Sequence, residues 1–140
     1  MKMIHKEKNL ILSNEVLDQY HQKLESIIKS KSLYLKPKLC LDDLYIETGI
    51  PVEYVKQVLS EKLNLTFFEF ISKYKIRRAK RLLTKIDNDH FSISNIAIES
   101  GFKTDESFVA LFKKHTHISP ENYRIKYYNI DPDSNNPVTD

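Results

Sequence analysis

Three pairs of acidic residues and one pair of histidines are the side chains whose types and spacing could support catalysis or metal binding. The acidic pairs are Asp42-Asp43, Asp87 with Asp89, and Asp105-Glu106. Two carboxylates can serve as general acid and base. Each pair, however, lies in a loop or at an expected helix start, where an acidic side chain is stabilised by the helix dipole. His115 and His117 lie two residues apart at an expected helix end, so their rings point apart, and no carboxylate or thiol lies at ligand spacing. The sequence therefore predicts no enzyme activity, no metal site and no cofactor.

Glycine and cysteine usage excludes further classes of protein. Gly49 and Gly101 are the only glycines, whereas phosphate-binding loops, dinucleotide folds and Gly-x-Ser-x-Gly hydrolases need clustered glycines. Cys40 is the single cysteine, which forbids an internal disulfide. No apolar stretch approaches the ~20 residues that cross a bilayer, and the amino terminus is charged where a signal peptide needs an apolar core. We expect a cytoplasmic chain that does not associate with membranes.

Apolar residues recur at helical spacing along most of the chain, and no segment alternates long enough to predict a strand. The expected helices run from Val16 to Ile28, Leu41 to Thr48, Pro51 to Leu63, Thr66 to about Ile86, Ser94 to Ser100 and Asp105 to His115, with a last helix opening at Ser119-Pro120. Ser13 and the Thr66–Glu69 capping box are expected helix starts. The chain is predicted to be all-α.

An internal repeat relates two sets of these expected helices. Residues 44–50 align with residues 96–102 at an offset of 52, and both contain a Glu-x-Gly-apolar turn. The pairs that match after the turn, at an offset of 53, are Val55 with Phe108, Val58 with Leu111, Leu59 with Phe112, and Phe70 with Tyr123. One helical hairpin could produce this spacing by chance, but two copies indicate a duplicated helix-turn-helix. In that motif the first helix braces the second, which presents its polar amino-terminal side to a DNA major groove.

The helix from Thr66 to about Ile86 is expected to join the two copies. It has two apolar faces, about 130° apart at ~100° per residue, and each face is expected to serve a separate small core. The faces consist of Phe67, Phe70, Ile71 and Tyr74, and of Ile76, Ala79, Leu82, Leu83 and Ile86. Its length of about 30 Å is close to the ~34 Å that separates successive major-groove faces.

The predicted fold is therefore two homeodomain-like, duplicated helix-turn-helix subdomains joined by a long linker helix. The expected parts are a flexible N-terminus (1–12), a first subdomain (13–65), the linker helix (66–86), a second subdomain (87–128) and a disordered acidic tail (129–140). The net charge is +3, and residues 66–86 carry seven bases against one acid. This balance fits a polyanion binder, although a solvated helix surface explains the same lysines and arginines equally well.

Several motifs at fixed spacing resemble the AraC/XylS-type transcriptional regulators, over about Lys31 to Tyr128. The motifs are Leu41-Asp42-Asp43-Leu44, Phe67-x-x-Phe70-Ile71, Arg78-Ala79-x-x-Leu82-Leu83, Ile96-Ala97-x-x-Ser100-Gly101-Phe102, Phe108-x-x-x-Phe112-Lys113-Lys114-x-Thr116 and Ile118-Ser119-Pro120-x-x-Tyr123-Arg124. The resemblance implies two subdomains that bind adjacent major grooves of promoter double-stranded DNA. Tyr34-Leu35-x-Pro37-x-Leu39 is similar to the subgroup in which this C-terminal domain follows a sensor. A sensor or dimerisation domain in a longer protein and an RNA polymerase subunit are further partners that the resemblance suggests.

The resemblance implies DNA contacts by the second helix of each copy. The residues at the contacting positions are Val52, Glu53, Lys56, Gln57 and Ser60 in the first copy, and Thr104, Asp105, Glu106, Val109, Lys113 and Lys114 in the second. A Gln amide at position 57 can pair with adenine, and Lys56 can reach guanine or a phosphate. Lys113 and Lys114 are expected near the DNA backbone.

The chain also departs from the family pattern. Tyr45 replaces a small residue, Cys40 a Ser/Thr cap, and His117 a frequent glycine. Ala110 stands where arginine is common, beside the acidic pair Asp105-Glu106, which repels phosphates but can accept from a cytosine amino group. Two functions follow as alternatives: a sequence-specific DNA-binding regulator, or a diverged module whose acidic second recognition helix docks a protein partner in transcription control.

Overall fold

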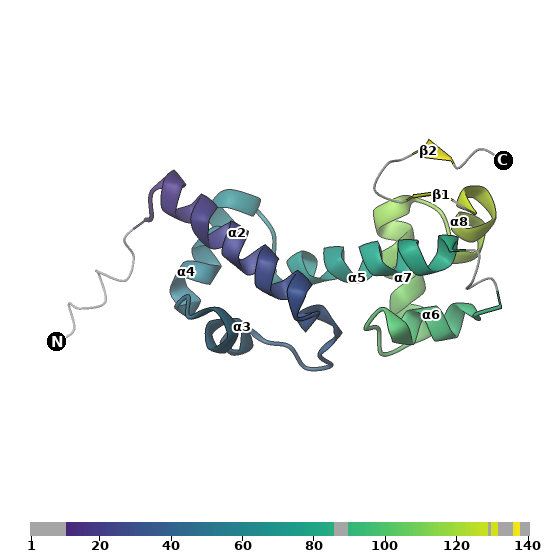
Figure 1. Cartoon of the computed structure of the whole chain (residues 1–140), viewed down its shortest axis with the longest axis horizontal. Helices are drawn as coiled ribbons and strands as arrows, with labels where there is room; N and C mark the ends of the chain where they lie inside the picture. The colour runs from purple at the N-terminus through teal and green to yellow at the C-terminus, as the bar shows by residue number, and fades with distance from the viewer. Residues whose placement is uncertain (1–10, 86–89, 129, 132–135, 138–140) are drawn as a thin grey trace. The chain divides into compact units, whose positions relative to one another are not determined.

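The computed structural model describes residues 11–85, 90–128, 130–131 and 136–137, and nearly all of this part is helical (Figure 1). The helices are α2 (Asn14–Ser30), α3 (Leu41–Thr48), α4 (Val52–Gln57), α5 (Phe67–Thr84), α6 (Ile93–Glu99), α7 (Asp105–Thr116) and α8 (Pro120–Tyr127), with a 3-10 turn η1 (Leu33–Leu35) and a π-helical segment η2 (Val58–Leu63). The all-α prediction is confirmed. Within the described ranges, no helix combines the length and apolar character that crossing a bilayer requires.

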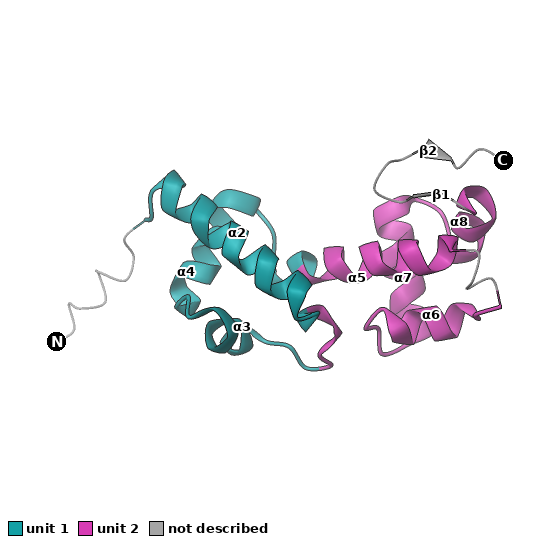
Figure 2. Cartoon of the chain, viewed as in Figure 1, with its two compact units in different colours: residues 1–33, 38–70 teal, residues 34–37, 71–140 magenta. Residues whose placement is uncertain are grey.

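The chain divides into two compact units (Figure 2). Unit 1 comprises Met1–Leu33 and Lys38–Phe70, and unit 2 comprises Tyr34–Pro37 and Ile71–Asp140. The division falls inside α5, whose first residues belong to unit 1 and whose remainder belongs to unit 2. Phe67 and Phe70 of the first predicted face belong to unit 1, whereas Ile71 and Tyr74 of the same face belong to unit 2 with the rest of the helix. The domain boundaries given above from the sequence stay a prediction.

Unit 1 consists of α2 packed on the helix-turn-helix pair formed by α3 and α4 with η2. Its buried apolar residues include Leu17, Leu24, Ile28, Leu44, Val55, Val58 and Leu59. The predicted Ser13 cap is confirmed, since its side chain accepts from the Val16 amide at 3.2 Å. α2 contacts the second helix of the pair through stacked Tyr20 and Tyr54 rings, whose centroids are 5.9 Å apart.

Unit 2 packs α6, α7 and α8 against the larger part of α5. Its buried core consists of Ile76, Ala79, Leu83, Ile96, Ala97, Phe102, Phe108, Phe112 and Tyr123. Four of these rings form a continuous series, with neighbouring centroids 5.0 to 5.6 Å apart. Leu82 is partly buried against the same core. The described residues of the second predicted face therefore pack within unit 2, and Ile86 lies outside the described residues.

Helix ends follow the predicted caps closely. Thr66 and Glu69 form the expected capping box, in which the Glu69 amide donates to Thr66 Oγ1 at 3.0 Å and the Thr66 amide donates to Glu69 Oε1 at 2.9 Å. Asn64 and His117, which correspond in the repeat, both end a helix in the left-handed region, with φ of 54° and 69°. Glycine is the residue that adopts this conformation without strain, which explains why glycine is frequent at the His117 position in the resembling family.

The structure differs from the sequence expectation at the carboxyl end. Two-residue strands β1 (Ile130–Asp131) and β2 (Asn136–Pro137) pair antiparallel, where the sequence predicted no strand. Strands of two residues are too short to produce a detectable alternation of apolar and polar residues. The rest of the predicted disordered tail, and residues 1–10 of the predicted flexible N-terminus, lie outside the described residues.

Candidate nucleic-acid interface

The turn of unit 1 is a tight link between α3 and α4. Gly49 ends α3 with φ of 79°, a left-handed conformation, and its amide donates to the Tyr45 carbonyl at 2.7 Å. Thr48 Oγ1 donates to the Leu44 carbonyl at 2.6 Å and accepts from the Ile50 amide at 3.1 Å. Ile50 is buried. Glycine, a buried hydroxyl and the apolar plug together fix the angle at which α4 leaves α3.

The turn of unit 2 repeats the glycine and the apolar plug, and its glycine lies closer to neighbouring atoms than Gly49 does. Gly101 has φ of 95°, and a Cβ built on it would lie 3.1 Å from the Tyr34 carbonyl oxygen. Phe102 is the buried plug. Thr104 then caps α7, because its side chain accepts from the Ser107 amide at 3.1 Å. The helix pair therefore shares the glycine and the apolar plug with unit 1, as the sequence repeat predicts. The hydroxyl of Ser100, the counterpart of Thr48, is buried and makes no hydrogen bond with the described residues.

The first candidate recognition helix, α4 continuing into η2, exposes three of its five predicted contact residues. Glu53, Lys56 and Ser60 are exposed, whereas Val52 and Gln57 are half-buried. The Ser60 hydroxyl donates to the Lys56 carbonyl at 3.0 Å. Gln57 Oε1 accepts from the Leu12 amide at 2.8 Å, a contact that the sequence did not indicate.

The second candidate recognition helix, α7, exposes all but one of its predicted contact residues. The exposed residues are Thr104, Asp105, Glu106, Lys113 and Lys114, and Val109 is half-buried. Asp105 Oδ2 accepts a hydrogen bond from the Ser94 hydroxyl of α6. The Glu106 side chain is exposed and makes no hydrogen bond or ion pair with the described residues. The two neighbouring carboxylates therefore differ: one links α6 to α7, and the other faces solvent.

Two arginines of the quoted motifs act inside unit 2. Arg78 Nε donates to the Glu99 carbonyl at 2.7 Å, at the end of α6. Arg124, on α8, donates from Nη1 to the Phe91 carbonyl at 2.7 Å and from Nε to the Leu83 carbonyl at 3.5 Å. Carbonyls at a helix end have no partner within the helix, so these guanidinium groups join the ends of α5 and α6 to the rest of the unit. Sequence reasoning did not assign them this role.

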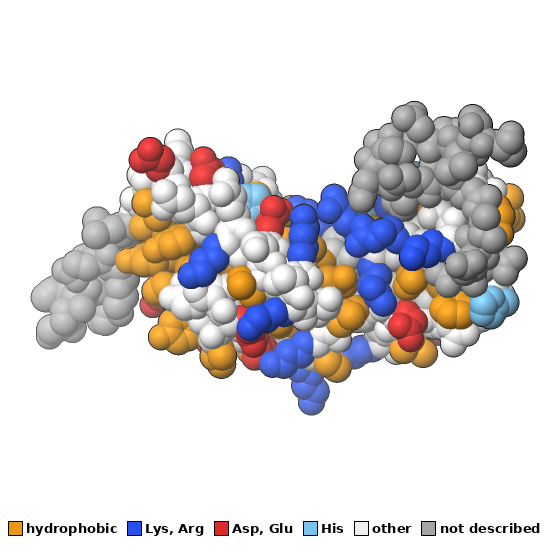
Figure 3. All heavy atoms as spheres, in the orientation of Figure 1, with side chains coloured by type: hydrophobic (Ala, Val, Ile, Leu, Met, Phe, Trp, Pro, Cys, Tyr) orange, Lys and Arg blue, Asp and Glu red, His pale blue; other side chains and the backbone are white. Residues whose placement is uncertain are grey.

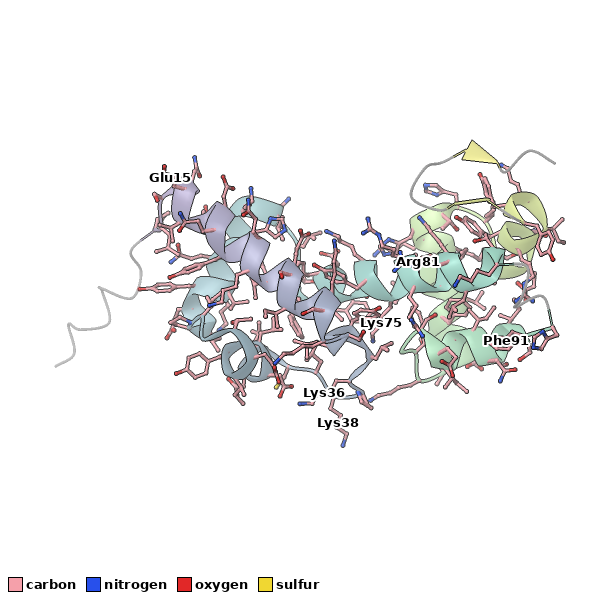
Figure 4. The ribbon with its side chains drawn as sticks, in the orientation of Figure 1. Glu15, Lys36, Lys38, Lys75, Arg81 and Phe91 are labelled. Carbon is pink, nitrogen blue, oxygen red and sulfur yellow. The ribbon has the colours of Figure 1, made fainter. Side chains whose placement is uncertain are left out.

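Lysine and arginine side chains gather over α5 in the view of Figure 3. Lys73 and Arg77 of α5 are exposed, as is Lys85 just after the helix. Lys75 and Arg81 also extend from α5 (Figure 4). The Lys75 ammonium lies 5.6 Å from the centroid of the Phe102 ring. Burial, and secondarily the nearby Lys103 charge, lower the Lys75 pKa from its ordinary value. Lys75 is therefore part of the packing of unit 2, whereas the exposed bases provide positive surface. No cluster of potential metal-ligating side chains occurs among the described residues.

Comparisons with known proteins identify the fold and its family. A family model described as a helix-turn-helix domain matches residues 44–126, more than half of the chain. An uncharacterized HTH-type transcriptional regulator of Staphylococcus aureus (strain COL) is 30% identical over 125 residues, which cover 89% of this chain and 16% of that protein. The HTH-type transcriptional activator RhaR of Mannheimia succiniciproducens is 27% identical over 105 residues, covering 75% of this chain and 37% of RhaR. The chain thus spans well under half the length of these relatives.

A solved structure agrees with the family match. A transcriptional regulator from Chromobacterium violaceum, described as containing an AraC-type DNA-binding domain, superposes with a TM-score of 0.65 at 19% identity. The similarity covers 78% of this chain and 95% of that structure. All three of these proteins are described as transcriptional regulators. The chain belongs to the helix-turn-helix domain family, and within it to the DNA-binding domains of AraC/XylS-type transcriptional regulators.

Proposed function

We propose that this chain binds double-stranded DNA with sequence specificity and regulates transcription, with α4 and α7 lying in two adjacent major-groove segments. The observation that carries the proposal is the repetition of one construction in both units: a bracing helix, a glycine turn with a buried apolar plug, and a second helix with exposed polar side chains. An α-helix fits the major groove, where base edges present distinct donor and acceptor patterns.

In unit 1, Glu53 and Lys56 are the base-contacting residues in this proposal. Both are exposed near the start of the second helix, which is the part of a recognition helix that reaches base edges. Lys56 donates to guanine O6 or N7, and Glu53 accepts from a cytosine amino group. Val52 and Gln57 flank this face, and Ser60 lies farther along it, toward a phosphate.

In unit 2, Glu106 and the exposed lysines Lys113 and Lys114 take different roles. A carboxylate near the amino terminus of α7 is repelled by phosphates but accepts from cytosine N4. The two lysines, in the last turn of α7, supply phosphate contacts that add affinity without sequence information. Asp105 is linked to Ser94, so we assign it to fixing the angle of the helix pair, with Thr104 as the cap and Val109 packed beside it.

Selection of bound sites from duplexes with a randomised central segment tests the proposal. We expect two recovered blocks of base preference separated by about one helical turn, roughly 10 base pairs. A single block assigns sequence readout to one unit, and recovery of no motif refutes sequence-specific binding. Lys56→Ala should change the preference within one block, whereas the matched control Lys29→Ala, at an exposed position of α2, should leave both blocks unchanged.

A protein-docking role is the second candidate function, favoured by the acidic, arginine-free surface of α7 around Glu106 and Ala110. In that case a regulator or RNA polymerase subunit would bind this helix. Binding of genomic fragments no better than random DNA at moderate salt, together with stoichiometric binding of an isolated polymerase subunit, would favour docking. Loss of that binding in Glu106→Gln would locate the docking surface on α7.

The wider regulatory role is also a proposal. RhaR carries the name of a transcriptional activator, and we propose activation for this chain as well. The chain corresponds to 37% of RhaR and 16% of the staphylococcal relative, so a sensor or dimerisation domain in a longer protein fits the same scheme. A reporter gene placed downstream of the selected site tests the direction of regulation.

A further inference from the structure

The segment immediately before α2 is attached to the candidate recognition helix of unit 1. The Leu12 amide donates to Gln57 Oε1 at 2.8 Å, and this half-buried bond joins residues 45 positions apart in the chain. The segment is held on its other side by the α2 cap, where the Leu17 amide donates to the Ser13 carbonyl at 2.9 Å. Leu12 is thus fixed between the start of α2 and the end of α4.

α2 itself is anchored along the same helix. Lys62, in η2, forms an ion pair with Asp18, and Tyr20 stacks on Tyr54 of α4. These contacts keep the start of α2 beside α4 and η2, so the Leu12–Gln57 bond is supported by neighbouring contacts. The supported bond limits where the Gln57 carboxamide points.

The bond matters because of how glutamine recognises a base. Bidentate pairing with adenine uses both ends of the carboxamide, the amide donating to N7 and the carbonyl oxygen accepting from N6. Gln57 lies one helical turn after exposed Glu53, on the same side of α4, yet its carbonyl oxygen is turned toward Leu12 and the residue is half-buried. A carboxamide held in this orientation does not offer its carbonyl end to a base.

We propose that the Leu12 backbone amide is a specificity-determining group: it holds the Gln57 carbonyl and thereby suppresses adenine readout by unit 1. This inference rests on the proposed DNA binding and adds to it a prediction about base preference. Readout by unit 1 then depends on Glu53 and Lys56. Release of the segment before α2 gives the helix an additional adenine contact, so the state of this segment changes which sites the protein prefers.

Proline at position 12 tests the proposal in the full chain, because proline has no amide hydrogen. We select sites with the wild type, Leu12→Pro, Gln57→Ala and the double variant. Leu12→Pro should raise the preference for adenine over other bases at one position about tenfold, which is within the discrimination that one bidentate contact provides. Gln57→Ala should change the preference little in the wild type and abolish the new adenine preference in the double variant. Ile11→Pro, at a neighbouring exposed residue, is the matched control and should behave like the wild type.

Three outcomes separate the proposal from its alternatives. Identical motifs for the wild type and Leu12→Pro, or an adenine preference that Gln57→Ala removes from the wild type, overturn the assignment of Leu12 while leaving DNA binding intact. An adenine preference that persists in the double variant also overturns it, because the effect then does not pass through Gln57. Failure of every variant, including the wild type, to select a motif refutes the proposed function itself.

Amide exchange of Leu12 in the wild-type chain gives a second test, which stands if Leu12→Pro does not fold. The amide should exchange slowly in the free protein, because it is hydrogen-bonded and half-buried. We then compare wild-type complexes with two duplexes that differ only at the base facing Gln57, which is adenine in one of them. The Leu12 amide should be equally protected from exchange in both complexes. Exchange as fast as that of an unprotected amide in the free protein overturns the proposal.

Discussion

Alanine at Gly101 should destabilise unit 2 more than alanine at Gly49 destabilises unit 1, although both glycines end the first helix of a helix-turn-helix pair. Both have positive φ, 79° at Gly49 and 95° at Gly101, a conformation that costs an L-residue about 1–2 kcal/mol. Alanine also restricts the unfolded chain, which offsets about 0.4–1 kcal/mol of that cost. Backbone conformation alone therefore predicts a loss of about 1 kcal/mol at either site.

The surroundings of the two glycines differ. A Cβ at Gly49 would meet no atom within 4 Å, whereas a Cβ at Gly101 would lie 3.1 Å from the Tyr34 carbonyl oxygen and 3.4 Å from Leu35 Cδ2 and Lys75 Cε. The closest atom belongs to the backbone, so it cannot move away by a change of rotamer. Overpacking of this kind costs about 1–3 kcal/mol. We expect Gly101→Ala to lower the free energy of unfolding by about 2–4 kcal/mol.

Urea unfolding followed by circular dichroism measures the difference. With a slope of about 2 kcal/mol per molar urea, Gly101→Ala should lower the midpoint by roughly 1–2 M and Gly49→Ala by roughly 0.5 M. Adding Lys75→Ala to Gly101→Ala should not restore the midpoint, because the carbonyl contact remains. An equal or larger effect at Gly49, or recovery in the double variant, would refute the assignment of the cost to the Tyr34 carbonyl.

Three further predictions concern the arginine contacts, the alkaline pH dependence and the phosphate contacts. Arg124→Ala should lower the free energy of unfolding by about 1.5–3 kcal/mol, because it leaves the Leu83 and Phe91 carbonyls without their charged donor; exposed Lys126→Ala on the same helix should change the thermal midpoint little, and a similar loss in both variants would contradict this. The pKa of Tyr123 is raised from its ordinary value by burial and then by Tyr127. The unfolded chain therefore ionises first, and stability is lost as the pH rises above about 10. The urea midpoint of Tyr123→Phe should fall less between about pH 9 and 11 than that of the wild type, and parallel curves would exclude this origin. Lys113→Ala should weaken DNA binding equally for all sequences and reduce the slope of log affinity against log salt by about 1, as measured by fluorescence anisotropy; a loss confined to particular base substitutions would assign Lys113 to the bases instead.

The elements and turns were predictable because their signals are local. The Ser13 cap, the Thr66–Glu69 capping box and the two positive-φ glycines each involve residues within a few positions of one another, and all are present. The left-handed conformation of His117 also follows from the family position at which glycine is frequent. A cap or a positive φ restricts which residue types can occupy a position, so the sequence repeat predicted two helix-turn-helix pairs.

Contacts between distant residues were not predictable, and they changed the interpretation of several side chains. Gln57 has the right chemistry for adenine, but its carbonyl oxygen is held by Leu12. Asp105 was grouped with Glu106 as an acidic pair, yet it accepts from Ser94 on the preceding helix. Tyr45 replaces a small residue and remains half exposed, whereas Ala97, its counterpart in the repeat, is buried. Nothing in the local spacing of these residues specifies a partner in another element.

The two units thus share their turns but differ in what holds the second helix in place. In unit 1 the supporting contacts come from the amino-terminal side, through α2: the Lys62–Asp18 ion pair, the Tyr20–Tyr54 stack and the Leu12–Gln57 bond. In unit 2 the Ser94 hydroxyl of α6 donates to Asp105 at the start of α7, and Phe108 and Phe112 of α7 pack in the buried core. The arginines on α5 and α8 bind the carbonyls of Glu99, Leu83 and Phe91 instead. A change in the chain before α2 therefore acts directly on the second helix of unit 1, while the contacts of unit 2 lie elsewhere in the sequence. Under the proposed function, this asymmetry makes base readout by unit 1 the part of DNA recognition that an upstream segment can adjust.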